Sequence, residues 1–293
     1  MNDADLIRFY ANDAADDVAG CWEISPTEAN LPMHAFLQPG FFKLADGGNF
    51  SFPPKLTKAA MSNNIVLRLG RLDRVGYGWL AELQLGNYFD ALRSNFAMEQ
   101  CPGEAGLSLR EQLHAETQSV GSLQDNPLLN HLGLVAMVRT ADQNWIIQQR
   151  SSKVANRGKT SSASVSGAVN AEDIRAQDEM DIGTMSGTTE PPLQQRINLK
   201  AVLERALMRE CKEELAVPLA DVQFLGLLRE FQRGGKPEAY FFARTPATLT
   251  EVVGRHRLAG DRCEADAISA EVIAPANFTL RTGIALCQQL GLS

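Results

Sequence analysis

The chain has 293 residues, of which 44% are hydrophobic and 22% are charged, so it can bury the core of one large or two modest domains. Its formal net charge of −7 argues against a general nucleic-acid binder, because no excess of lysine and arginine is available to displace counterions from a phosphate backbone. The five cysteines are scattered and never spaced as C-x-x-C, which indicates reduced thiols and a cytoplasmic protein. No apolar run approaches the roughly 18 residues of a membrane span, so we expect no membrane partner.

Residues 1–125 are predicted to form a smaller α+β unit. An Asp-Gly-Gly turn between aromatic-rich arms predicts a hairpin over 40–56, and residues 63–85 read as strands joined by a glycine-rich turn. Helices are expected over 88–100 and 108–117, the second opened by Ser108 with Glu111 three residues later, which is a capping-box pair. The unit's role is left open between oligomer contact, lid and substrate specificity.

A polar, proline-containing stretch at 120–130 reads as a linker, so a second domain is predicted over 126–293. Its first elements are a strand, turn and strand hairpin, with an apolar run over 131–139, a turn at 140–144 and a second strand over 145–150. A Gly- and Ser-rich loop with a short strand around 163–165 follows, and 174–198 reads as an irregular insertion.

A long helix is predicted to begin after Asn198, because an apolar stripe at helical spacing follows this favourable N-cap residue. Pro218 is expected to stop it. The remaining elements are predicted as strands over 223–231, 239–244 and 267–273, and a last helix from a Thr279 N-cap to about residue 290.

Glu210, Glu213 and Glu214 lie three and four residues apart in the long helix and therefore project to the same side. Like charges at this spacing repel one another, so the cluster is either a solvated face or a site for a divalent cation. Spacing by itself leaves both interpretations open.

The sequence around these carboxylates resembles the Nudix hydrolase family, whose signature is G-x5-E-x7-R-E-U-x-E-E-x-G-U, with U a bulky apolar residue. A hairpin ending in Gln-Gln-Arg, a Ser-Gly loop and a helix bearing the motif occur in the family's order. The second half of the signature is matched by Arg209, Glu210, Cys211, Glu213, Glu214, Leu215, Ala216 in place of the glycine, and Val217.

The first half departs from the signature. Ser166-Gly167-Ala168 keeps only the first glycine of the family's Pro-Gly-Gly turn, and the expected glutamate falls at Ile174, one or two residues after Glu172 and Asp173. From Asp173, 35 residues intervene before Arg209 where the family has seven, so the resemblance implies a box split by an insertion of about 28 residues.

The resemblance implies an α/β/α sandwich with a mixed sheet and hydrolysis of a diphosphate linkage in a nucleoside diphosphate derivative. Mg²⁺ or Mn²⁺ would be held by Glu210, Glu213, Glu214 and the carbonyl of Gly167. The three glutamates are also the candidate catalytic residues.

For the small phosphorylated substrate, Arg150 is the candidate phosphate contact, since its planar fork grips phosphate oxygens in a bidentate way. Glu238 is a further candidate, for which a turn glutamate is the competing interpretation. The run Arg150-Ser-Ser-Lys-Val-Ala155 is similar to the animal branch that hydrolyses UDP-glucose and UDP-galactose, so a UDP-sugar is the first substrate expected, while the whole chain looks closer to bacterial Nudix-like proteins. A fold that binds a nucleotide or partner without hydrolysis is the alternative.

Overall fold

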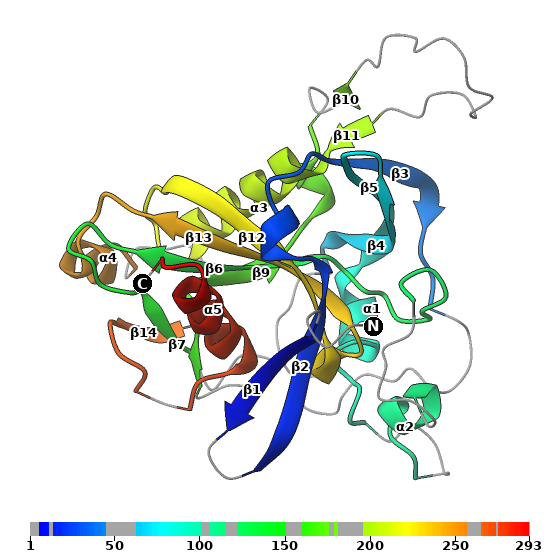
Figure 1. The fold of residues 1–293 in the computed structure, drawn as a ribbon, viewed down its shortest axis with the longest axis horizontal. Coiled ribbons are helices and arrows are strands. Elements are labelled where there is room, and N and C mark those ends of the chain that lie inside the picture. Colours follow the sequence, from blue (N-terminus) through cyan, green and yellow to red (C-terminus); the bar gives the residue numbers. More distant parts are fainter. Residues whose placement is uncertain are drawn as a thin grey trace.

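The computed structural model describes residues 6–11, 14–44, 63–100, 106–114, 122–150, 160–175, 179–180, 196–256, 265–273 and 275–292. These residues form three sheets and five α-helices (Figure 1). In spatial order the six-stranded sheet contains β1 (Leu6–Ala11), β2 (Ala14–Ile24), β12 (Ala220–Glu230), β13 (Lys236–Arg244), β6 (Gly133–Arg139) and β9 (Val165–Ala168). The five-stranded sheet contains β10 (Glu179–Met180), β11 (Arg196–Asn198), β3 (Met33–Phe41), β5 (Gly78–Asn87) and β4 (Ile65–Val75). The three-stranded sheet contains β14 (Ala265–Ser269), β7 (Ile147–Arg150) and β8 (Ser161–Ser162).

The helices differ widely in length. They are α1 (Tyr88–Arg93), α2 (Leu109–His114), α3 (Leu199–Glu214), α4 (Leu249–His256) and α5 (Phe278–Gln289), with short 3₁₀ turns at η2 (Pro26–Glu28), η3 (Ala171–Asp173) and η5 (Phe231–Arg233). Among the described residues no helix is long and apolar enough to cross a membrane.

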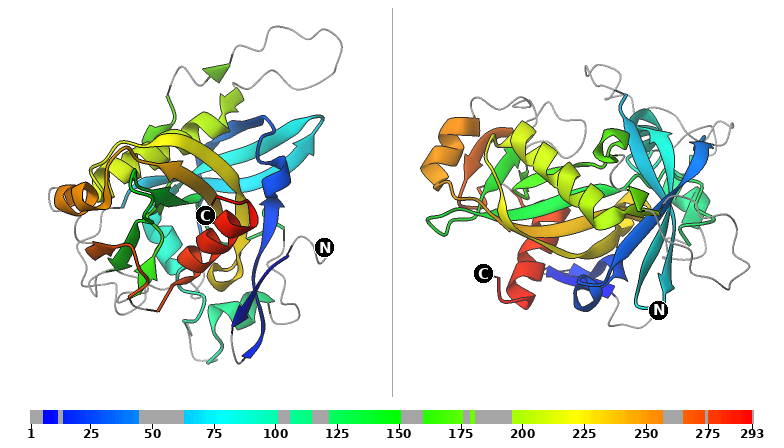
Figure 2. Two further views of the ribbon diagram at one scale, coloured as in Figure 1. Left: turned by 60° about the vertical axis from the view of Figure 1, so that its left-hand side comes forward. Right: turned by 90° about the horizontal axis from the view of Figure 1, so that it is seen from above.

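The six-stranded sheet is mixed and carries a helix on each face. Strands β13 and β6 are parallel, whereas the other neighbours are antiparallel. Because side chains alternate along a strand, Ala239 and Phe241 of β13 join the core beneath α3, while Tyr240 and Phe242 join the core beneath α5. Figure 2 shows α3 and α5 on opposite sides of these strands. The predicted α/β/α sandwich with a mixed sheet is confirmed.

Helix α3 begins as its sequence predicts, but it ends four residues before Pro218, the predicted stop. The Asn198 side chain accepts a hydrogen bond from the backbone N–H of Ala201 at 3.2 Å, and the apolar stripe is buried against the sheet. The helix ends at Glu214, and Ala216 then adopts a left-handed conformation with φ of 55° before Pro218 is reached. Ala216 occupies the position where the family signature has glycine, the residue that adopts this conformation without steric cost.

The predicted strands over 63–85 are confirmed as the antiparallel pair β4 and β5, which turn at Gly76. The capping box of α2 is also confirmed, since the backbone N–H of Ser108 donates to Glu111 Oε2 at 2.7 Å and that of Glu111 donates to Ser108 Oγ at 3.2 Å. The hairpin predicted over 40–56 lies largely outside the described residues, because 45–62 are not among them.

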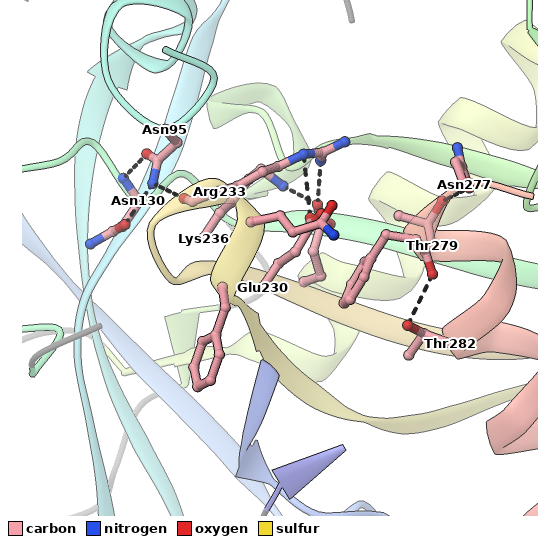
Figure 3. Close-up of polar contacts among 12 residues, drawn as sticks. Asn95, Asn130, Glu230, Arg233, Lys236, Asn277, Thr279 and Thr282 are labelled. Carbon is pink, nitrogen blue, oxygen red and sulfur yellow. Dashed lines mark hydrogen bonds and ion pairs between the residues drawn. The ribbon is translucent and has the colours of Figure 1, made fainter. Parts of the chain in front are cut away.

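The two predicted units share sheets and a core. Strand β2 pairs with β12, and β11 pairs with β3. Within the stretch read as a linker, Leu128, Leu129 and Asn130 are buried, and Asn130 exchanges hydrogen bonds with Asn95 (Figure 3). The division at residue 125 into separately folding units stays a prediction.

Several sequence predictions differ from the structure, among them the helix over 88–100, which ends at Arg93. The hairpin over 131–150 opens after a single bridge between Arg139 and Trp145, because β7 leaves β6 to pair with β8 and β14. The predicted irregular insertion 174–198 carries two short strands, β10 and β11, while 176–178 and 181–195 lie outside the described residues. The N-cap of α5 is Asn277, which accepts from the N–H of Leu280 at 3.0 Å, and not Thr279. Helix α4 was not predicted.

Candidate active site

The two halves of the split box meet through Arg209 and Asp173. The guanidinium donates from Nε to Asp173 Oδ1 at 3.0 Å and from Nη2 to Oδ2 at 2.9 Å, a bidentate pair in which Asp173 is 4% exposed. Arg209 Nη2 also donates to the carbonyl of Ala168 at 2.9 Å. The insertion therefore separates the halves in sequence, but not in space.

The same guanidinium links Asp173 to the carboxylates of α3. Arg209 Nη1 lies 2.7 Å from Glu210 Oε1 and 3.3 Å from Glu213 Oε2. Burial lowers the pKa of Arg209, but its hydrogen bonds to Asp173 and the charge of Glu210 outweigh burial and raise that pKa overall. Arg209 is thus a permanent cation at the centre of an acidic cluster.

Gly167 makes room for the carboxylate of Glu210. A Cβ atom at Gly167 would lie 2.1 Å from Glu210 Cδ, so any other residue would displace this side chain. Gly167 lies in β9, where it pairs with Leu134 of β6, and β9 packs against α3. The structure therefore brings together two of the predicted metal ligands, Gly167 and Glu210.

Glu214 lies one turn farther along α3 and is 4% exposed. Its Oε2 accepts hydrogen bonds from Gln148 Nε2 at 2.8 Å and from the backbone N–H of Ser166 at 3.3 Å. His256 Nδ1 lies 2.8 Å from the carbonyl oxygen of Glu214, which ties α4 to the end of α3. Glu210 and Glu214 therefore both face β9. The alternative that these two carboxylates lie on a solvated face of the helix is excluded.

Glu213 differs from the other two glutamates, because its side chain is half-exposed at 48% and borders Arg209. Among the described residues no group of three or more His, Cys, Asp or Glu side chains is arranged to hold a metal ion. The oxygen donors present, the Glu210 and Glu214 carboxylates beside Gly167, are of the hard type that Mg²⁺ and Mn²⁺ prefer. Their chemistry fits such an ion, with its remaining ligands supplied by water and substrate phosphate.

Cys211 occupies the apolar position of the motif and behaves as a core residue. Its Sγ lies 3.4 Å from the carbonyl of Val217, and burial raises the pKa of the thiol to about 12. The thiol is therefore protonated and unreactive at neutral pH.

Arg150 ends β7 two residues after Gln148. Because side chains alternate along a strand, Arg150 and Gln148 lie on the same face of β7, which is the face toward Glu214. Arg150 is half-buried, and its backbone N–H donates to Thr160 at 2.8 Å. Its role as a phosphate contact stays a prediction, and residues 151–155 of the Arg-Ser-x-x-Val-Ala stretch lie outside the described residues.

Glu238 lies on the other face of the sheet. It has the same parity in β13 as Tyr240, which packs beneath α5, and its carboxylate pairs with Lys236 and with Arg233 Nη1 at 3.0 Å. Burial raises the pKa of Glu238, and the two cations oppose this shift. Figure 3 shows Arg233 and Lys236 in this buried network beside Glu230. The structure thus does not bring Glu238 together with Glu210 and Glu214.

Two contacts of the site were not predicted. Gln148 was noted only as part of Gln-Gln-Arg, and the sequence does not distinguish it from Gln149, because Ile146 and Ile147 before them are both buried apolar residues. Asp173 was recognised as an acid close to the expected position, but its pairing with Arg209 needs the three-dimensional path of the insertion.

The loop carrying Gly167 and Asp173 closes on α3 over the mixed sheet, which is the arrangement the signature implies. The fold is an α/β/α sandwich with a mixed sheet. No protein-family model and no curated protein matches the sequence. Solved structures similar to the chain include DR0079 from Deinococcus radiodurans, at 17% identity over 54% of this chain and 82% of DR0079, with a TM-score of 0.31. Another is Tm1382, a protein assigned provisionally to the Nudix hydrolases, at 15% identity over 54% of this chain and 71% of Tm1382, with a TM-score of 0.32.

Proposed function

We propose that the protein hydrolyses a diphosphate linkage in a nucleoside diphosphate derivative with Mg²⁺ or Mn²⁺, a UDP-sugar being the first substrate to test. One observation carries the proposal: Glu210 and Glu214 are held one helical turn apart against β9, beside Gly167, in a box closed by Asp173 and Arg209.

Different residues of the chain would have different roles in such a reaction. Glu210 and Glu214, with the carbonyl of Gly167, would hold the divalent ion, which when bound polarises a phosphoryl oxygen and offsets charge on the leaving phosphate. Arg150 would grip a substrate phosphate, and Arg209 holds the Glu210 carboxylate in place.

One of the glutamates would orient a water molecule in line with the scissile bond and accept its proton. Glu213, the most exposed of the three, has access to such a water. The water oxygen bonds to phosphorus, the bridging P–O bond breaks, and a nucleoside monophosphate and a second phosphorylated product leave.

The test is release of nucleoside monophosphate from a panel of nucleotide sugars and dinucleotides with Mg²⁺ or Mn²⁺. Glu214→Gln should lower kcat by about 100-fold or more, since acid–base and metal-binding groups supply factors of this size. Glu204→Gln, on the same helix but outside the motif, is the matched control and should keep the wild-type rate. A wild-type kcat in Glu214→Gln would show that the proposed site is wrong.

A second function is binding without hydrolysis. It is favoured by Ala168 in place of the second glycine of the box, and by Ile174 at the position of the expected glutamate. Calorimetry that finds tight nucleotide binding without metal, together with no turnover of the panel, would select this alternative.

A further inference from the structure

The side-chain amide of Gln148 joins β7 to the carboxylate of Glu214. Its Nε2 donates to Glu214 Oε2 at 2.8 Å and to the carbonyl of Ser164 at 2.8 Å. An amide nitrogen carries two hydrogens, so both of its donors are used. A flipped amide would set its oxygen against two acceptors, and the contact therefore has one orientation.

The second acceptor, Ser164, is itself fixed. Its Oγ accepts from the backbone N–H of Val138 at 2.8 Å and donates to the carbonyl of Ile146 at 2.5 Å. Ser164 thus spans β6 and the start of β7, and Gln148 is anchored to a rigid part of the core. All of these side chains are buried, so water cannot replace the contact at low cost.

We propose that Gln148 is a positioning residue, which orients the Glu214 carboxylate for the divalent ion and thereby sets metal affinity and turnover. This inference rests on the proposed function. Glu214 Oε2 receives a second hydrogen bond from the backbone N–H of Ser166, which a side-chain substitution leaves in place, whereas the hydrogen bond from Gln148 can be removed by substitution. Partners that orient metal ligands in this way typically contribute about 10- to 100-fold in metal affinity or activity.

The neighbouring residue provides a matched control. Gln149 has the same side chain in the same strand but faces the other way, where Nε2 donates to Ser269 Oγ at 3.2 Å and Oε1 accepts from Ser161 Oγ at 2.9 Å. Gln148→Met and Gln149→Met remove the amide with little change of volume. Gln148→His keeps an N–H donor at a similar reach.

Mn²⁺ affinity is measured on the protein without substrate, by electron paramagnetic resonance, and kcat and KM are measured separately. Gln148→Met should weaken Mn²⁺ binding and lower kcat by about 10-fold or more, with KM for the nucleotide within about twofold of wild type. Gln149→Met should match wild type in all three, and Gln148→His should recover part of the loss. A Tm of Gln148→Met equal to that of Gln149→Met shows that both variants fold.

Wild-type Mn²⁺ affinity in Gln148→Met overturns the inference, as does an equal loss in Gln149→Met. A wild-type protein that binds Mn²⁺ but turns over no nucleotide defeats the proposed function alone, because Gln148 is then judged by Mn²⁺ affinity. A wild-type protein that binds no Mn²⁺ overturns both.

Discussion

Replacing Asp173 by alanine removes the acid that closes the split box. Three hydrogen bonds disappear, two from Arg209 at 3.0 and 2.9 Å and one from the backbone N–H of Asn170 at 2.8 Å. Hydrogen bonds to charged groups each contribute about 1.5–3 kcal/mol. Arg209 keeps Ala168 and Glu210 as partners and has some contact with solvent, so the losses do not add fully. We expect the free energy of unfolding to fall by about 3–5 kcal/mol, as when a buried ion pair loses one partner.

Urea denaturation at pH 7 measures this loss, and Glu172→Ala provides the control. Glu172 precedes Asp173 and also approaches Arg209, but at 3.7 Å and with a side chain that is 69% exposed. Exposed ion pairs contribute about 1 kcal/mol or less, so Glu172→Ala should change the free energy of unfolding by no more than that. Equal losses for the two substitutions would show that burial and bidentate geometry at Asp173 do not stabilise the box.

Two further predictions concern stability. Burial, with the charges of Lys236 and Arg233, holds the pKa of His131 well below 6.5. As the pH falls below 6.5, the unfolded chain binds a proton at this residue before the folded protein does. The free energy of unfolding therefore decreases by up to about 1.4 kcal/mol for each pH unit. Urea denaturation at pH 7 and 5 should show a smaller loss for His131→Gln than for wild type, and equal losses would contradict this. Ala216→Gly should raise the free energy of unfolding by about 0.5–1 kcal/mol because it relieves the left-handed backbone, and this gain appears as a higher urea midpoint, whereas a lowered midpoint would show no strain there.

Local signals predicted much of the fold. Asn198 as N-cap, the apolar stripe of α3 and the Ser108–Glu111 capping box each act within a few residues, and the structure confirms all three. The hairpin over 131–150 was wrong because apolar alternation identifies a strand but not its partner. The cap of α5 was misplaced because Asn277 and Thr279 are both good caps two residues apart.

The candidate site was predicted as a set of residue types more than as a geometry. Glu210 and Gly167 meet as the family resemblance implies, because their motif positions fix them on adjacent elements. Glu238 was a candidate for binding the substrate, but the alternation of side chains in β13 places it on the opposite face of the sheet from Glu210. Gln148 could not be chosen over Gln149 without knowing which face of β7 meets α3.

The closure of the box has a consequence for how the chain tolerates change. Asp173 and Asn198 lie on either side of the insertion, and Arg209 joins Asp173 to α3 through contacts with residues that the structure describes outside it. The closure of the box therefore does not depend on the length of the chain between β10 and β11. Residues gained or lost there in evolution, or a reporter domain inserted there, should leave the Arg209–Asp173 pair in place.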